Sequence, residues 1–440
     1  MIHPLYISPK EKKVFFILFV IFIPIVFFIM PGKATAQTTL KEYIDSASIN
    51  NPQLITLQNQ IEIFKLGKKS MKAIYSAPKG YISSDINLVP YFNNKGGLFT
   101  TNPSVNAVGY DIGITNGGLY SALFNVDFPV FSKKKTHNAL FWQNQQINTL
   151  KIRKKNLLLN IDRQVTNLYF TTLGVQLSYL TQKETVRLLS EEVKIMEQLT
   201  QKGLYRLVDY ELLKTTLSND SITLKNLENT FHISILKLKS ACGIADTTVS
   251  LLKTEKIRQN QVNKLSSVFI QPFINDSITA IARDRLFNNR YLPKVMLYSN
   301  AGLNAVSLNG IEKKMGVSAG IRLSYTLFDG KQKEVSKEQS LIQINKARQL
   351  KQLKSKNLLM QRKFLLNAIN ETRKNLEQQA RLKINYKKLI KLYKIEVQKG
   401  QVPITGFLMA LRNYNTLKLN YGLQEIKLYQ LINEYNYWNN

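Results

Sequence analysis

Side chains that could carry out catalysis or bind a metal are scarce in this sequence. Cys242 is the only cysteine, so neither a disulfide nor a cysteine-based zinc site can form within one chain. The three histidines, His3, His137 and His232, leave little for a metal enzyme. The sequence also contains no phosphate-binding loop and no arrangement of nucleophile and base. We therefore expect no enzymatic activity, no catalytic residue, no cofactor and no bound metal.

The N-terminal segment has the pattern of a secretory signal. Three lysines precede an apolar run over 14–30, and Ala34-Thr35-Ala36 then supplies the small residues that signal peptidase requires. We expect residues 1–36 to be removed, so that the mature chain begins at Gln37. The alternative is an uncleaved anchor, because a run of this length is at the lower edge of what spans a bilayer.

Two segments predict very long helices. From Ile161 to Met196, positions spaced alternately four and three residues apart are apolar at nine of eleven sites, which is the seam of a coiled coil. Each long helix would run for roughly 100 Å. Both end at a Gln-Lys-Gly sequence, where glycine can adopt a left-handed turn, and helices resume over 208–241 and from 405 to about 437. The sequence therefore predicts two long helical hairpins.

The hairpins belong to an internal repeat. The stretch 124–131 and the stretch 321–328 share one alternating pattern, and the two Gln-Lys-Gly sequences recur at the same offset of 197 residues. We expect a first structural repeat over 37–242 and a second over 271–440, each with a helix, two strands and a helical hairpin. Residues 243–270 then link the two repeats, and the family resemblance described below implies that they form an equatorial linker.

Two strands precede each hairpin, and their length and alternation fit a membrane. The expected strands cover 80–90, 118–131, 294–304 and 316–328. Val126, Phe128 and Val130 fall on one face and polar residues on the other, so one face could meet lipid and the other water. A soluble, half-buried sheet is the alternative. Aromatic residues near the strand ends favour the membrane: Tyr81, Tyr91, Phe92, Tyr110, Tyr120 and Tyr298.

Four strands predict an assembly of several chains. About eight strands is the smallest number that closes a barrel with a filled interior. An open sheet in a bilayer would leave unpaired backbone groups in hydrocarbon, each costing several kcal/mol. Two chains would supply eight strands and three would supply twelve. Three chains could enclose a lumen, so we expect a homotrimer.

Several short motifs, in order along the chain, resemble the outer membrane efflux protein family of TolC-like channel tunnels. They are Thr39-Leu40-Lys41-Glu42-Tyr43-Ile44 with Asn50-Asn51-Pro52, then Tyr291-Leu292-Pro293-Lys294, and then Leu327-Phe328-Asp329-Gly330. The resemblance covers essentially the whole mature chain. It implies a mixed α and β fold: a trimeric channel tunnel whose four transmembrane strands per chain form a twelve-stranded barrel, with coiled-coil hairpins in a periplasmic tunnel.

The resemblance also implies a function and partners. The chain would be the outer membrane channel of a tripartite efflux or type I secretion system in a Gram-negative bacterium, with a large periplasmic portion. It would be a passive exit duct, since an inner-membrane RND or ABC transporter delivers substrate through a periplasmic adaptor protein. Outer membrane lipid is the remaining partner.

The same resemblance assigns roles to two sets of residues. The hairpin turns would form the periplasmic tip, which closes the tunnel and receives the adaptor; the residues are Gly203, Leu204, Val208, Asp209, Gly400, Pro403 and Gly406. Gly406 stands where Asp209 stands in the first turn, so the acidic position is not repeated. The strand-to-helix junctions would be Phe131, Phe328, Asp329 and Gly330. The glycines could also be helix caps and nothing more.

The chain is strongly basic, with 61 Lys and Arg against 29 Asp and Glu and a formal net charge of +32. Between Lys331 and Lys399 there are 19 basic residues and 5 glutamates. This excess is consistent with a solvated helix face, with attraction for acidic partners or lipid headgroups, or with a tunnel biased against cations. We expect no nucleic-acid binding, because the chain is exported.

Two other classes of protein share some of these features. A periplasmic adaptor, or membrane fusion protein, is also exported and helical, but it has a single hairpin. A coiled-coil surface protein would need no pore and no strands. The 197-residue repeat favours the channel over the adaptor.

Overall fold

The computed structural model describes residues 39–87, 120–261, 267–305, 310–399 and 401–440. The predicted signal segment 1–36 lies outside the described residues, as do Tyr91, Phe92, Tyr110 and Gly400. None of the described helices is both long enough and apolar enough to cross a membrane.

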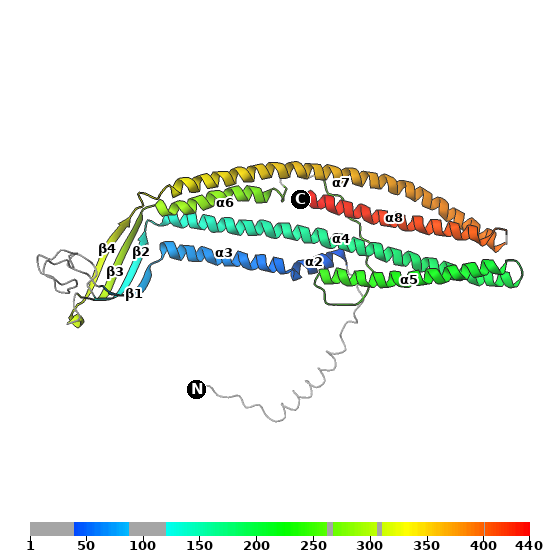
Figure 1. The fold of residues 1–440 in the computed structure, drawn as a ribbon, viewed down its shortest axis with the longest axis horizontal. Helices are drawn as coiled ribbons and strands as arrows, with labels where there is room; N and C mark the ends of the chain where they lie inside the picture. Colours follow the sequence, from blue (N-terminus) through cyan, green and yellow to red (C-terminus); the bar gives the residue numbers. More distant parts are fainter. Residues whose placement is uncertain (1–38, 88–119, 262–266, 306–309, 400) are drawn as a thin grey trace, which may run out of the picture. The chain divides into compact units, whose positions relative to one another are not determined.

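The order of helix, two strands and two helices occurs twice (Figure 1). The first set is α2 (Leu40–Asn50), α3 (Pro52–Ser76), β1 (Lys79–Ile86), β2 (Tyr120–Val130), α4 (Lys133–Gln201) and α5 (Leu207–Ala241). The second set is α6 (Gln271–Phe287), η1 (Asn288–Tyr291), β3 (Lys294–Ala305), η2 (Ile311–Lys313), β4 (Met315–Ser324), α7 (Gln332–Gln398) and α8 (Ile404–Trp438). The long helices α4 and α7 contain 69 and 67 residues, which confirms the predicted hairpins.

The described residues form two compact units, each with segments from both halves of the sequence. One unit, here called the hairpin unit, contains residues 39–47, 165–256 and 376–426. The other, here called the sheet unit, contains the described residues of 48–164, 257–375 and 427–440.

The sheet unit contains one antiparallel sheet in the order β1-β2-β3-β4. Phe128 of β2 pairs with Leu297 of β3, which in turn pairs with Ile321 of β4. Strand β4 ends at Ser324, four residues earlier than predicted. The reason is its partner: Ser324 pairs with Lys294, the first residue of β3, and Pro293 before it has no N–H to extend the ladder.

Helix termini in the sheet unit are fixed by buried or capping amides. The Asn51 side chain accepts hydrogen bonds from the backbone N–H groups of Gln53 and Leu54 and so caps α3, with Pro52 at the first helical position. Buried Asn138 of α4 donates from Nδ2 to Asn289 Oδ1 at 2.8 Å. The bond between Asn138 and Asn289 holds the start of α4 against η1, close to the strands.

The hairpin unit confirms the heptad seam. None of the eleven seam positions from Ile161 to Met196 is exposed, and those from Val165 onward lie in this unit. At the hairpin turns the seam joins one apolar cluster that includes Leu189, Met196, Leu213, Val397, Ile404, Phe407 and Leu411. Burial of these side chains from both hairpins stabilises the turns, since each is worth about 1.5–3 kcal/mol.

Candidate functional site: the sheet and the hairpin turns

One face of the sheet carries no charged side chain. The pairing places on this face every second residue of 80–86 in β1, 120–130 in β2, 295–305 in β3 and 315–323 in β4. Apart from two serines and the Tyr120 hydroxyl, these residues are apolar or glycine. Nine large side chains of this face are between 42% and 84% exposed: Ile82, Ile86, Phe124, Phe128, Leu297, Met315, Val317, Ile321 and Leu323. We call it the apolar face.

The opposite face, called the polar face, is cross-linked by side-chain contacts between strands. Asn125 donates from Nδ2 to Ser83 Oγ at 2.8 Å, and Ser318 donates from Oγ to Asn300 Oδ1 at 2.8 Å. The guanidinium of Arg322 lies 5.1 Å from the ring centroid of Tyr298. Such contacts are compatible with water on this side of the sheet.

The sheet is incomplete as it stands in one chain. Among the described strands, β1 pairs only with β2 and β4 pairs only with β3. An exposed apolar surface of this extent, with two open edges, marks a surface that a membrane or another chain must cover. The predicted alternation of Val126, Phe128 and Val130 against Asn125 is confirmed.

Gly203 ends α4 with a defined capping motif. Its φ of 74° is left-handed, its N–H donates to the Thr200 carbonyl at 3.0 Å, and the Leu204 N–H donates to the Leu199 carbonyl at 2.9 Å. This pair of bonds is a Schellman motif, in which glycine has no Cβ penalty. The turn leaves the side chains of Leu204 and Val208 exposed.

Asp209, by contrast, is only 6% exposed. Its carboxylate accepts hydrogen bonds from Arg206 Nε at 2.9 Å and from Arg206 Nη2 at 3.2 Å. It lies in the first turn of α5, where the helix dipole favours a negative charge. The hydrogen bond to Asp209 raises the pKa of Arg206. Asp209 therefore stabilises the start of α5.

The second turn differs at the equivalent position. A Cβ on Gly406 would lie 3.0 Å from Cε1 of Tyr393, so a larger residue would press on that ring. Pro403 is exposed immediately before α8. The absence of a side chain at Gly406 thus serves the packing of α8 against α7.

The two turns are joined by a residue that the sequence analysis did not identify. The Tyr205 hydroxyl lies 2.9 Å from the carbonyl oxygen of Val397 and 2.9 Å from that of Val402, and it can donate to either. Burial, followed by the charge of Asp209, raises the pKa of Tyr205. The available signal in the sequence was an aromatic residue within the turn between two predicted helices.

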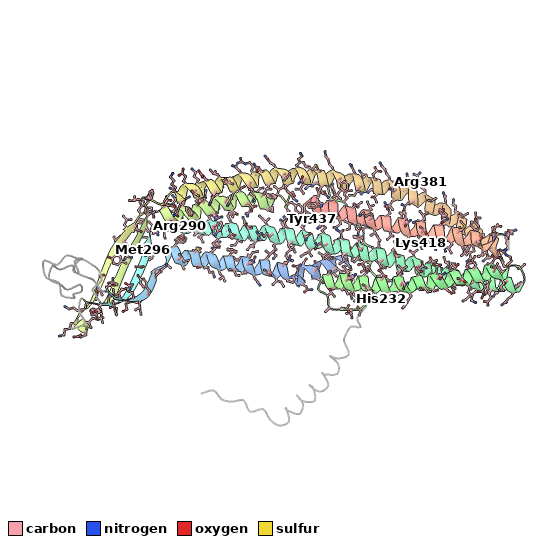
Figure 2. All side chains as sticks on the ribbon, in the orientation of Figure 1. His232, Arg290, Met296, Arg381, Lys418 and Tyr437 are labelled. Carbon is pink, nitrogen blue, oxygen red and sulfur yellow. The ribbon has the colours of Figure 1, made fainter. Side chains whose placement is uncertain are left out.

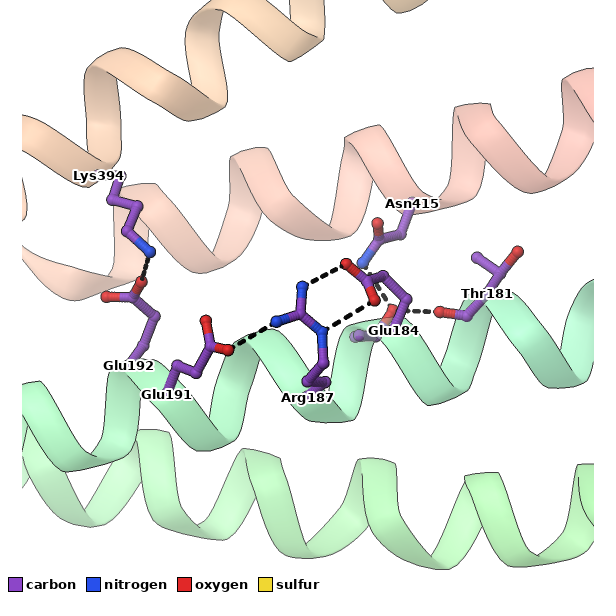
Figure 3. A network of polar contacts seen from close by, with 8 residues as sticks. Thr181, Glu184, Arg187, Glu191, Glu192, Lys394 and Asn415 are labelled. Atoms are coloured by element: carbon purple, nitrogen blue, oxygen red, sulfur yellow. Dashed lines mark hydrogen bonds and ion pairs between the residues drawn. The ribbon is translucent and has the colours of Figure 1, made fainter.

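A polar network continues from the turns along α4 (Figure 3). Lys394 of α7 forms an ion pair with Glu192 of α4 at 2.8 Å, although Glu192 is only 3% exposed. Asn415 of α8 donates to Thr185 Oγ1 of α4 at 2.8 Å. Lys394 belongs to the basic run of α7, so part of that run forms internal contacts in the hairpin unit.

The junction residues lie in the sheet unit, and the described turn residues lie in the hairpin unit. Phe131 and Phe328 are exposed, and Phe131 has a left-handed φ of 54°. Asp329 caps α7 by accepting hydrogen bonds from the N–H groups of Lys331 at 3.0 Å and Lys333 at 2.9 Å. A hydrogen bond from Tyr291, followed by the backbone bond from Lys333, lowers the pKa of Asp329. Gly330 follows with a φ of 63°.

Among the described residues, no group of three or more acidic, histidine or cysteine side chains could hold a metal ion. No protein-family model and no curated protein matches the sequence.

Solved structures do match the fold. The outer membrane protein VceC from Vibrio cholerae aligns with a TM-score of 0.66 at 12% identity, covering 91% of this chain and 95% of that chain. The CmeC outer membrane channel of Campylobacter jejuni also gives 0.66 at 12% identity, with 91% and 85% covered. The open state of the Neisseria gonorrhoeae MtrE outer membrane channel gives 0.62 at 13% identity, with 91% and 88% covered. The chain thus has the fold of TolC-like channel proteins, as its resemblance predicted.

Proposed function

We propose that this protein is the outer membrane channel of a tripartite efflux or type I secretion system and serves as a passive exit duct. The observation that carries the proposal is the apolar face: it is uncharged across all four strands, exposed, and bounded by two open edges. Lipid covers this face, and the polar face lines a water-filled passage.

The open edges require neighbouring copies. In a bilayer each unpaired N–H or C=O group at β1 and β4 would cost several kcal/mol, so β1 of one copy pairs with β4 of the next. Three copies supply twelve strands, enough to enclose a lumen, whereas two would give a barrel filled by its own side chains. The proposed assembly is therefore a homotrimer with a twelve-stranded barrel.

The helices of the sheet unit support the same assembly. Val335, Ile342, Leu353, Met360 and Phe364 follow one face of α7, because their successive spacings of seven, eleven, seven and four residues bring them to nearly the same side of a helix. All five side chains are exposed in the single chain. We assign this stripe to contacts with a neighbouring copy.

The hairpin turns are the proposed docking point for a periplasmic adaptor. Leu204, Val208 and Pro403 are exposed there, beside the bonds that Tyr205 makes between the turns. Energy comes from an inner-membrane RND or ABC transporter, and the channel opens when the turns separate. The protein accordingly resides in the outer membrane of a Gram-negative bacterium after removal of its signal segment.

Extraction in detergent followed by native mass measurement tests this function. Three copies give a particle of roughly 140–150 kDa that precipitates without detergent. A periplasmic adaptor or a coiled-coil surface protein would stay in solution without detergent. A monomer that stays in solution without detergent would refute the proposed channel function.

A further inference from the structure

A cavity of about 960 Å³ lies in the sheet unit, where the strands meet the helices. Residues of β1, β2 and β3 form one side, and η1 with parts of α3, α4, α6 and α7 forms most of the rest. Figure 2 labels two of its lining residues, Arg290 and Met296. A cavity of this size can enclose most of a small organic molecule.

The cavity is strongly cationic. Five basic side chains line it, namely Lys79, Lys135, Arg283, Arg290 and Lys294, and Asp127 is the only carboxylate among the lining residues. Lys135 Nζ donates to the Pro293 carbonyl at 2.9 Å. Burial, and then repulsion from Lys294, lowers the pKa of Lys135. An anion in the cavity would relieve this repulsion between like charges.

The wall of the cavity has an apolar part and a part that is held in place by a buried hydrogen bond. Trp142, Leu286 and Phe287 contribute apolar surface, and the guanidinium of Arg290 lies 4.9 Å from the centroid of the Phe287 ring. Asn289, which is buried, donates from Nδ2 to the Lys135 carbonyl at 2.9 Å. The cationic groups therefore stand beside aromatic surface on a preformed wall.

The cavity lies on the polar side of the sheet. Five of its seven strand residues belong to the polar face: Lys79, Asp127, Pro129, Lys294 and Met296. We propose that this cavity binds amphipathic organic anions, with an apolar body against Trp142 and Phe287 and a sulfonate, carboxylate or phosphate group among the basic residues. The inference rests on the proposed function, in which the polar face lines the export route. Amphipathic organic anions are then the class of substrate that the channel exports.

A fluorescent anion tests the site in the full-length chain in neutral detergent. Anilinonaphthalene sulfonate is the probe, and phenylnaphthylamine is its uncharged counterpart with the same aromatic framework. Trp438→Phe leaves Trp142 as the only tryptophan, so energy transfer from Trp142 reports a probe bound in the cavity. The test variant adds Arg290→Glu and Lys294→Glu. The control adds Lys69→Glu and Lys72→Glu, which change the charge equally on exposed positions of α3 that do not line the cavity.

We expect saturable energy transfer to the sulfonate. The double charge reversal at Arg290 and Lys294 should weaken the affinity for the sulfonate about tenfold, and the control substitutions should leave that affinity unchanged. The uncharged amine should bind both variants equally. Equal sulfonate affinity in the two variants, or equal loss of sulfonate and amine, would overturn the site. Native mass is recorded on the same samples: a trimer with no charge-dependent binding refutes the anion site alone, whereas a detergent-independent monomer refutes the channel.

Discussion

The Tyr205 hydroxyl lies 2.9 Å from the carbonyl oxygen of Val402, and these two residues are 197 positions apart, so they occupy equivalent places in the two hairpin turns. The internal repeat thus brings two equivalent positions together and uses them differently. In the first turn the position supplies a donor, and in the second turn it supplies a backbone acceptor. The bond ties the two hairpins at the end where we propose that an adaptor docks.

Removing this hydroxyl should loosen the turns. Tyr205→Phe keeps the ring in the apolar cluster but deprives the Val397 and Val402 carbonyls of their donor, at a cost of about 1 kcal/mol. Hydrogen exchange at residues 397–406 should accelerate, and channel conductance in planar bilayers should rise. Tyr210→Phe, in the same cluster, is the control. Identical exchange in the two variants would show that the bond does not hold the turns.

Because Lys394 forms an ion pair, we expect lysines of the basic run of α7 to differ in how much they contribute to stability. Lys394→Met leaves the carboxylate of Glu192 buried without its ammonium partner, so the free energy of unfolding should fall by about 1–3 kcal/mol. Lys388→Met, at an exposed position of the same helix, should change it by less than about 0.5 kcal/mol. Chemical denaturation of both variants measures the difference. Equal stabilities would mean that Glu192 is solvated in the folded protein.

A charge on the apolar face should block membrane insertion. Ile321→Arg places a guanidinium among lipid chains at a cost of about 2–4 kcal/mol near the middle of a bilayer. Gly316→Arg introduces the same group on the polar face, where a Cβ meets no atom within 4 Å. The amount of urea-resistant trimer in membranes should fall for Ile321→Arg only. A loss of equal size in both variants would contradict the assignment of the faces.

Cys242 should react slowly with alkylating reagents. The thiol is buried, and burial raises its pKa to about 11. At pH 8 its thiolate fraction is then about 100-fold below that of an ordinary cysteine. Because the unfolded thiol ionises at lower pH, the stability that it contributes is lost as pH rises from about 9 through 11. Mass spectrometry after a timed iodoacetamide reaction measures the rate, and rapid labelling of folded protein would contradict this burial.

The elements predicted best from the sequence depend on local signals. The apolar repeat up to Met196 and the glycine at position 203 fix the end of α4, and alternation in β2 fixes which residues share a face. The end of β4 was predicted four residues too late because it depends on its partner strand, which begins only after Pro293. Alternation continues past Ser324 in the sequence, but the pairing of β4 with β3 ends there.

The candidate site was less accessible to sequence reasoning. The resemblance assigned Gly203 and Asp209 to a docking turn, and the sequence did not indicate that Arg206 would engage the Asp209 carboxylate at the start of α5. The bonds of Tyr205 and Lys394 join segments about 200 residues apart. No local sequence pattern predicts such pairs, because they form only when the two hairpins pack together.

The lipid exposure of two adjacent residues of β4 tests the central claim most directly. Single cysteines replace Val317, on the apolar face, and Ser318, on the polar face, in a Cys242→Ser background, and each carries the same fluorophore in liposomes. A quencher attached to lipid chains should quench the label at position 317 and a water-soluble quencher the label at position 318. Quenching of both labels by the aqueous reagent alone would show that the apolar face does not meet lipid and would contradict the channel.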